Sequence, residues 1–404
     1  MASEITVIPN GSVTSPQGFT AGATYAGIRA YTPDKVDLGI LFSEQPTTAA
    51  GTYSTNKILS PSVTVTKESV AGGVTRGVIV NSGCANCAVG DQGYTDAQEM
   101  ASLAAGVLGV DPSTMAASST GIIGVELPMG LIRNAIGNIE QSPDGGHDFA
   151  RSILTTDTVT KEIAVSFSAG GKRVTLAGCA KGSGMIHPNM ATMLSYLTTD
   201  AQVDAAFLQE TLGVVVDSTF NMIDIDGDSS TNDTVLLLAN GASGVTLSKG
   251  TPEGDTFTAA LLEVCTHLAR EMVRDGEGAT KLIEVTVEGA ESVSDARLAA
   301  RSVASSILVK TAIHGNDPNW GRIIMALGKS GAEMVEKNIG LYINDICIME
   351  SGLPIPVFRE SLIASMQGTE VRILAKLNIG SGAATGWGCN MSEEFVTFNS
   401  AYTT

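Results

Sequence analysis

The sequence predicts a layered α/β protein with mixed strand directions. Strand-like and helix-like segments alternate along the whole chain of 404 residues, a pattern that favours sheets covered by helices. With 43% hydrophobic and 16% charged residues, the chain can bury two or three ordinary cores. Its 45 glycines are scattered without a fixed period, which indicates many turns rather than a repeat protein.

Hydrophobic spacing locates the elements of the first half. Residues 75–83 (TRGVIVNSG) form an apolar run that predicts a short strand. Residues 100–107 carry apolar side chains at i, i+3, i+4 and i+7, which predicts a helix. A second helix is expected to start at Pro128, because proline suits the first helical position. Alternation on both sides of Gly170-Gly171 predicts a β-hairpin over residues 161–178.

The second half continues the alternation. The expected order is a strand from about 192 to 197, a helix from about 203, a strand at 234–241, a helix over 261–272, a strand at 281–289, a helix from about 295, and single strands at 339–348 and 370–380. No proline-rich or charged linker divides the chain. Residues 274–281 (RDGEGATK) are the best hinge, and a C-terminal subdomain is expected from about 282 to 404.

Charge and hydropathy exclude several classes of function. The formal net charge of −18 argues against nucleic acid or an anionic membrane as the main partner, because the field of the protein would repel both. No uncharged apolar run reaches the roughly 18 residues that a membrane span needs. The opening MASEITVIPNGS lacks the basic and apolar regions of a signal peptide, so we expect a cytoplasmic protein.

Three motif-like segments fail their chemical tests. Lys181 precedes Gly182 in GCAKGSG, whereas a phosphate-binding loop needs lysine after its second glycine. Residues 224–233 (DIDGDSSTND) alternate aspartates like a calcium loop, but lack glycine at the sixth and glutamate at the twelfth position, which favours a polar turn. The lone C-x-x-C of Cys84 and Cys87 has no second pair or nearby histidine, so two buried thiols are favoured and no metal is expected.

The segment KGSGMIHPNMATML (residues 181–194) raises a chemical question about Thr192. A threonine hydroxyl is a poor nucleophile unless a base takes its proton, and the α-amine of an N-terminal threonine is one such base. Thr192 would have to be exposed by cutting the Ala191-Thr192 bond. A glycine- and proline-containing approach and a following buried strand suit such a cut. These features alone leave a purely structural threonine open.

The same segment resembles the self-cleavage segment of the ornithine acetyltransferase family, the bifunctional glutamate N-acetyltransferases of arginine biosynthesis. Further similar segments follow in the family's order: SSTGIIGVELPM (118–129), TTDT (155–158), DIDGDSSTNDTVLLLANGASG (224–244), DGEGATK (275–281), LVKTAIHGNDPNWGRI (308–323) and NSAYTT (399–404). The resemblance runs from about residue 10 to the C-terminus. It implies the self-cleaving, N-terminal-nucleophile type of α/β sandwich of the ornithine acetyltransferase/DmpA-like fold.

The resemblance also implies roles for individual residues. Thr192 would be the nucleophile with its own amine as general base, freed by cleavage after Ala191 into chains of residues 1–191 and 192–404. Thr120 and Gly121 match the oxyanion-hole pair. The substrate-contact positions of the family fall on Thr155, Lys181, Thr192, Glu277, Asn399 and Thr404. We expect Lys181 to bind the α-carboxylate of N-acetylornithine and Glu277 its ammonium group.

The implied reaction is ping-pong transfer of acetyl from N²-acetyl-L-ornithine through an acetyl-Thr192 ester to L-glutamate. The resemblance implies no metal or cofactor, acetyl-CoA as a second acetyl donor only in a bifunctional member, and a heterotetramer of two copies of each cleaved chain. An N-terminal-nucleophile amidase or aminopeptidase, in which water takes the acyl group, and an uncleaved amino-acid-binding protein are the competing interpretations. Cys84, Cys87 and Asn390 depart from the residues usual in the family.

Overall fold

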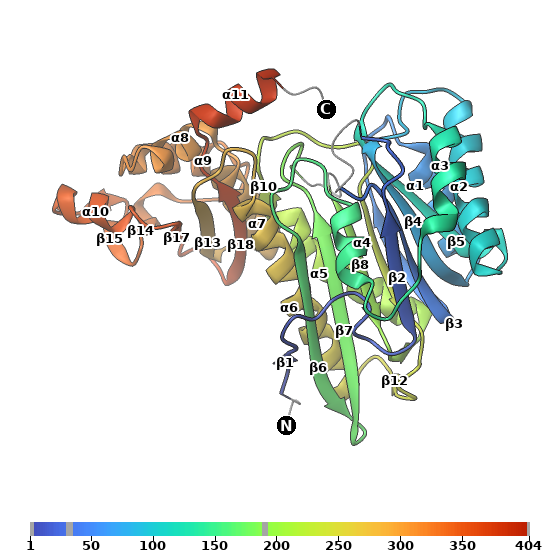
Figure 1. Ribbon diagram of the computed structural model, residues 1–404. Helices are drawn as coiled ribbons and strands as arrows, with labels where there is room; N and C mark the ends of the chain where they lie inside the picture. Colours follow the sequence, from blue (N-terminus) through green and yellow to red (C-terminus); the bar gives the residue numbers. More distant parts are fainter. Residues whose placement is uncertain (1–3, 30–34, 188–192, 402–404) are drawn as a thin grey trace.

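Two mixed β-sheets form the framework of the computed structural model, which describes residues 4–29, 35–187 and 193–401 (Figure 1). The strand order of the first sheet is β1 (Thr6–Val7), β6 (Lys161–Ala169), β7 (Lys172–Lys181), β8 (Leu194–Thr199), β11 (Thr234–Ala239), β3 (Leu38–Tyr53), β4 (Thr75–Cys84) and β5 (Met115–Ile122), and β2 (Phe19–Thr24) also pairs with β3. Parallel pairs, such as β4 with β5, occur beside antiparallel ones. The predicted mixed strand directions are therefore confirmed.

The long strand β3 divides the first sheet into two halves. Its residues 38–42 pair with β4 and its residues 48–53 pair with β11, and the register shifts between Phe42 and Thr47. A core that joins β4 and β5 to β8 and β11 contains Val78, Val80, Ala116, Leu194, Tyr196, Leu236 and Leu238. Because this apolar core needs both halves, the two halves stack face to face as a sandwich.

Helices cover the outer face of each half. The helices α1 (Pro61–Ala71), α2 (Gln92–Leu108) and α3 (Met129–Ala135) share a core with β3, β4 and β5. The helices α5 (Ala205–Ser218) and α6 (Pro252–Arg274) pack on β6, β7, β8 and β11. The short helix α4 (Gly146–Ser152) contributes Phe149 to the core between the halves. The arrangement is a four-layer α/β/β/α sandwich, in agreement with the predicted fold class.

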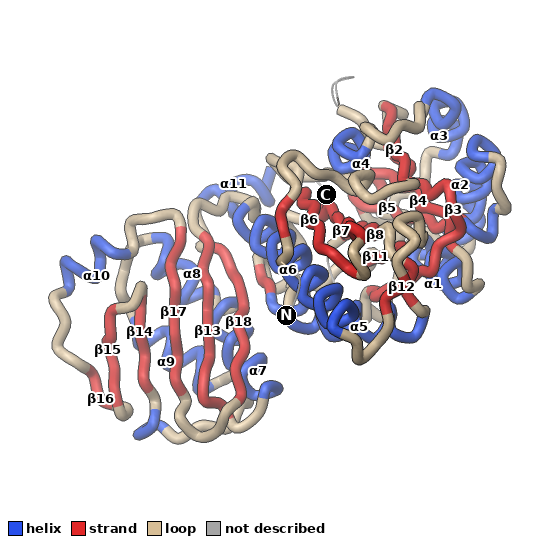
Figure 2. Tube along the Cα trace, turned by 90° about the horizontal axis from the view of Figure 1, so that it is seen from below, coloured by secondary structure: helices blue, strands red, loops and turns tan. Residues whose placement is uncertain are grey.

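The second sheet lies beside the sandwich, on the side of α6 (Figure 2). Its strand order is β10 (Ile223–Asp224), β18 (Gly382–Cys389), β13 (Leu282–Ala290), β17 (Glu370–Lys376), β14 (Gly340–Ile343), β15 (Ile346–Glu350) and β16 (Leu353–Pro354). The remaining helices are α7 (Val293–Ala304), α8 (Ile307–His314), α9 (Trp320–Gly328), α10 (Arg359–Ser365) and α11 (Glu393–Ala401), and β9 (Gln202–Val203) pairs with β12 (Thr246–Leu247). The loop 275–281 connects α6 to β13 and so joins the sandwich to this sheet.

One prediction about strands needs correction. Residues 339–348 form two strands rather than one, because Asn344 and Asp345 both adopt positive φ and make a two-residue hairpin turn between β14 and β15. The predicted strand through Leu194 and Leu197 is confirmed as β8, and Thr192 itself lies outside the described residues. Among those residues, no helix combines the length and apolar character needed to cross a bilayer.

The burial of α6 gives a first testable prediction. Leu268 is 0% exposed in the core under the first sheet, whereas Leu262 on the same helix is 41% exposed. We expect Leu268→Ala to lower the free energy of unfolding by about 2–5 kcal/mol, because it leaves a cavity in a packed core. The matched Leu262→Ala should change it by less than about 0.5 kcal/mol. Urea unfolding compares the two variants, and equal losses would contradict the observed packing of α6.

Candidate active site

A cavity of about 730 Å³ opens at one end of the sandwich. The C-terminal ends of β5 and β7 meet the N-terminal ends of β8 and β11 there, since Thr120, Lys181, Leu194 and Asp233 all line it. The loop 275–281 and the C-terminal helix α11 close a further side through Glu277 and Asn399. Six predicted site residues that the structure describes therefore line a single cavity: Thr120, Gly121, Thr155, Lys181, Glu277 and Asn399.

Thr120 and Gly121 lie near the end of β5, where backbone conformation demands glycine. Gly121 has a φ of 130° and stands directly opposite Gly83 of β4. A Cβ atom at Gly121 would lie 2.3 Å from the Gly83 carbonyl carbon, a distance that no side chain can occupy. Both Thr120 and Gly121 line the cavity at this close approach of β4 and β5. This geometry suits donors aimed at a small, charged oxygen.

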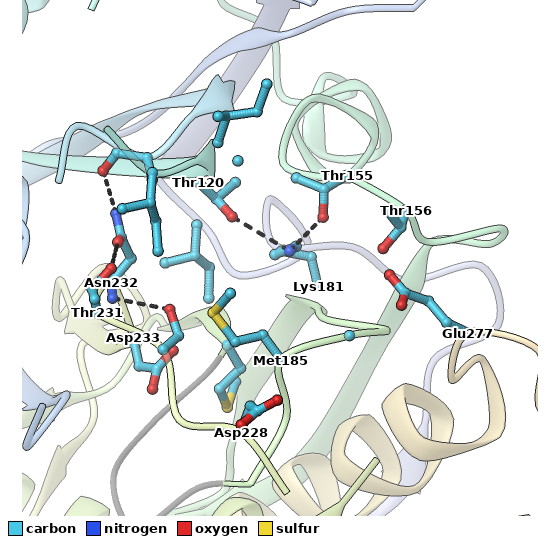
Figure 3. Close-up of a pocket in the computed structure, with 18 of the residues that line it drawn as sticks. Thr120, Thr155, Thr156, Lys181, Met185, Asp228, Thr231, Asn232, Asp233 and Glu277 are labelled. Atoms are coloured by element: carbon cyan, nitrogen blue, oxygen red, sulfur yellow. Dashed lines mark hydrogen bonds between the residues drawn. The ribbon is translucent and has the colours of Figure 1, made fainter. Parts of the chain in front are cut away.

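Lys181 is a buried cation rather than a solvated loop charge. Only 7% of the residue is exposed, and its ammonium donates to Thr155 Oγ1 at 2.6 Å and to Thr120 Oγ1 at 3.4 Å (Figure 3). Burial lowers the pKa of Lys181 from its ordinary value of 10.5, while the negative charge of Asp157 acts in the opposite direction. A buried ammonium held by two hydroxyls retains donor capacity for an anionic group in the cavity.

Glu277 lies on the other side of the cavity from Asp233 (Figure 3). Asn399 of α11 donates to Glu277 Oε2 at 2.8 Å, and the backbone N–H of Glu277 donates to the Ser183 carbonyl at 2.8 Å. A Cβ atom at Gly184 would lie 2.5 Å from the Glu277 carboxylate, so a side chain there would require this carboxylate to move. Glu277 belongs to the loop 275–281 and not to the end of a long helix, since α6 ends at Arg274.

The acidic loop of residues 224–233 holds both sides of the segment that contains Thr192. Asp226 accepts the backbone N–H groups of Met185 and Ile186, and Asp224 pairs with His187 at 2.7 Å. On the other side, the backbone N–H of Met193 donates to Asp233. Burial raises the pKa of Asp226, and burial raises that of Asp233 well above its ordinary value. The loop that the sequence indicated as a polar turn is therefore part of the cavity wall.

Three predicted site residues, Ala191, Thr192 and Thr404, lie outside the described residues. The described residue that follows Thr192 in the chain, Met193, lines the cavity beside Leu194. The cavity wall thus continues to the residue adjoining Thr192.

Sequence reasoning missed several residues around this cavity. Asn232 donates to the carbonyl groups of Ala85 and Ser119 and so ties the acidic loop to β5. Asp233 lines the cavity, and Asp157 accepts the backbone N–H groups of Thr155 and Gly182. Their position in the sequence could have identified them, because each lies in a segment that resembles the family, TTDT or DIDGDSSTND.

The departures from the usual family residues have local explanations. Cys84 and Cys87 are both buried free thiols, as predicted, and Cys84 lies at a register shift of β4, where it opposes both Thr120 and Ile122 of β5. Asn390 accepts the backbone N–H groups of Thr280 and Lys281 through its side-chain oxygen and places its amide nitrogen 2.9 Å from the ring of His314. Both the oxygen and the nitrogen of the Asn390 amide therefore have hydrogen-bond partners.

Comparison with known proteins extends over almost the whole chain. The model of the ArgJ family matches residues 20–404. The arginine biosynthesis bifunctional protein ArgJ of Dehalococcoides mccartyi is 46% identical over 405 residues, with 100% of both chains covered. The protein of the same name from Bacillus subtilis is 43% identical over 397 residues, with 98% of this chain and 97% of its own covered.

A solved structure agrees with these sequence matches. The crystal structure of the arginine biosynthesis bifunctional protein from Bacillus halodurans is 41% identical and aligns with a TM-score of 0.51. The alignment covers 52% of this chain and 100% of the solved chain. With the family match over residues 20–404 and relatives at 43% to 46% identity along the full length, the chain belongs to the ArgJ family.

Proposed function

We propose that this chain transfers acetyl from N²-acetyl-L-ornithine to L-glutamate in arginine biosynthesis, as an N-terminal-nucleophile enzyme activated by cleavage after Ala191. The observation that carries the proposal is the convergence of Thr120, Gly121, Thr155, Lys181, Glu277 and Asn399 on one cavity beside Met193. These residues come from five separate segments of the chain, so their meeting is a property of the fold. The names of the relatives from D. mccartyi and B. subtilis agree with it.

In this mechanism the Thr192 hydroxyl adds to the acetyl carbonyl carbon while its proton passes to the Thr192 α-amine. The developing oxyanion is stabilised by Thr120 and Gly121, a type of contact whose loss typically costs about 3–4 kcal/mol of barrier. The carbon–nitrogen bond then breaks, and the departing α-amine of ornithine takes that proton. The amine of glutamate then attacks the carbonyl carbon of the ester and loses a proton to the Thr192 α-amine. The bond between this carbon and the Thr192 oxygen breaks, the oxygen regains the proton, and N-acetylglutamate leaves.

The charges of the cavity suit the substrate. N-acetylornithine carries an α-carboxylate and a δ-ammonium, and the cavity has a buried ammonium at Lys181 and a carboxylate at Glu277 on different walls. A charge-assisted pair with each of these two groups would fix the orientation of the substrate, and with it the direction of the acetamide on the α-carbon. The apolar side chains of Ile122, Met185 and Met193 line the same space and suit an uncharged acetyl group.

Cleavage into two chains has separate support. The solved B. halodurans chain aligns over 100% of its own length with 52% of this chain. Residues 192–404 make up 213 of the 404 residues, a similar share. We extend the proposal to a cytoplasmic heterotetramer of two copies of each cleaved chain, without a metal or bound cofactor in the reaction.

Replacing the nucleophile tests the cleavage step. Thr192→Ala should remain one polypeptide near 41.6 kDa on denaturing electrophoresis and should transfer no acetyl, because both the hydroxyl and the new N-terminus are lost. Thr192→Ser keeps a hydroxyl in place and should still be cut, with reduced transfer. Two bands from Thr192→Ala would rule out Thr192 as the residue that drives the cut.

Following labelled acetyl distinguishes transfer from hydrolysis. With acetyl-labelled N-acetylornithine, we expect N-acetylglutamate to form when glutamate is present and little free acetate to form when it is absent. Equal release of acetate in both mixtures would favour the amidase alternative. A parallel mixture of acetyl-CoA and glutamate alone measures whether the chain also has the second activity of a bifunctional member.

The proposed carboxylate contact of Lys181 predicts a pH dependence. Because burial lowers the pKa of Lys181 below 10.5, the ammonium loses its proton at a lower pH than an exposed lysine, and the KM for N-acetylornithine should rise as the pH rises through that value. Lys181→Met should raise KM at least about tenfold, since a charge pair is lost, and should flatten this alkaline rise. Lys172→Met, an exposed lysine on the same strand, is the control. An unchanged KM in Lys181→Met would contradict the assignment.

A further inference from the structure

A buried ion cluster lies behind the cavity wall. The Lys161 ammonium sits between two carboxylates, 2.6 Å from Asp157 Oδ1 and 2.6 Å from Asp275 Oδ2. The side chains of Lys161 and Asp157 are 0% exposed and that of Asp275 is 6% exposed. Removing three charges from water is costly, and an apolar replacement of such a cluster is often no less stable. A contribution to stability alone therefore explains the cluster poorly. The hydrogen bonds that its carboxylates make to neighbouring segments indicate another role.

Asp157 holds two segments that carry cavity side chains. Its Oδ2 atom accepts the backbone N–H of Thr155 at 3.1 Å, and its Oδ1 atom accepts the backbone N–H of Gly182, the neighbour of Lys181, at 2.7 Å. A single carboxylate thereby fixes the backbones that present the Thr155 hydroxyl and the Lys181 ammonium, which are themselves 2.6 Å apart. Movement of Asp157 would displace both partners of that hydrogen bond.

Asp275 extends the cluster to the loop 275–281. It accepts the backbone N–H of Thr158 at 3.0 Å and also the Thr158 hydroxyl, so it ties the loop to the segment of Thr155. Two residues later, Glu277 is bound to Ser183, whose hydroxyl lies 2.6 Å from that of Thr156. The three segments 155–158, 181–183 and 275–277 thus share one network around Lys161.

The cluster also sets the charge around Lys181. The charged groups facing this ammonium are Asp157, Lys161, Arg29 and Asp233. Burial and the two cations disfavour the protonated form of Lys181, and the two carboxylates favour it. Asp157 is the carboxylate shared between the two lysines, and their charges hold its pKa low in spite of its burial.

We propose that Asp157 is a positioning residue for substrate binding: paired with Lys161, which Asp275 also holds, it fixes the backbones of Thr155 and Gly182 and places a negative charge near the Lys181 side chain. The inference rests on the proposed function for the identity of the substrate, since Thr155 and Lys181 are its proposed contacts. The geometric part concerns only residues that the structure describes.

Titration of Lys181 tests the charge directly. In protein labelled at lysine ¹³Cε, the Lys181 signal is assigned by its loss in Lys181→Met, and its midpoint is followed by NMR. Asp157→Asn should lower that midpoint by about one pH unit or more, because a nearby counter-charge is removed. Lys161→Met should raise it, because a neighbouring cation is removed. General loosening of the structure cannot produce shifts of opposite sign, and either variant still tests the inference if the other fails to fold.

Asp200→Asn is the matched control. Asp200 is a buried carboxylate that accepts the backbone N–H groups of Gln17 and Thr175, but it follows the C-terminal end of β8, whereas Leu194 at the other end lines the cavity. Its variant should leave the Lys181 midpoint unchanged. A Lys181 midpoint unmoved by Asp157→Asn, or moved in the same direction by Asp157→Asn and Lys161→Met, would overturn the inference.

Kinetics then separates the positioning role from the proposed function. Asp157→Asn should raise the KM for N-acetylornithine at least about tenfold with a much smaller change in kcat, because a contact to bound substrate is weakened. Its alkaline rise in KM should begin at lower pH than in the unaltered protein, and the cut after Ala191 should persist. If the unaltered protein transfers no acetyl, the proposed function fails, while the NMR midpoints still decide whether Asp157 controls Lys181. An unchanged KM beside a shifted midpoint would overturn the substrate-binding part.

Discussion

The stacking of the two halves of the first sheet is the constraint on which the site depends. Because β3 pairs with β4 through residues 38–42 and with β11 through residues 48–53, the chain must fold this sheet over a shared apolar core. That core brings the end of β5 to the end of β7, which puts Thr120 within 3.4 Å of the Lys181 ammonium. Strand ends expose backbone and side-chain polar groups, so their meeting brings polar and charged groups to a cavity that apolar side chains also line.

Several charged side chains line this cavity. Carboxylates of Asp226, Asp228, Asp233 and Glu277 line it, together with the ammonium of Lys181. The protonated form of Lys181 is favoured by the neighbouring carboxylates and disfavoured by burial and by the neighbouring cations, so the position of each charge matters. The cluster of Asp157, Lys161 and Asp275 lies where it influences both the geometry and the charge of Lys181. Binding and positioning therefore share one network of buried groups.

Much of the fold could be predicted from periodicity. The hairpin around Gly170-Gly171, the strand 234–239 and the apolar stripe of α6 are confirmed, because local patterns of burial repeat every two or every three to four residues. The hairpin at Asn344-Asp345 was missed because an Asn-Asp turn lacks the glycine that usually marks one. The sandwich itself was beyond periodicity, since no local pattern reveals which strands stack.

The sequence by itself determined the elements, the type of core and, through ordered motifs, the family and the residues to examine. Lys181 or Glu277 taken singly carries no mark of function, because a charged side chain in a loop is ordinarily solvated. Only the tertiary structure decided that Lys181 is buried against Thr155, that Glu277 meets Asn399, and that Asp157 stands behind them. The physical reason is that burial, hydrogen bonds and charge coupling arise between residues far apart in the sequence, 122 positions for Glu277 and Asn399, and depend on distances that folding alone sets.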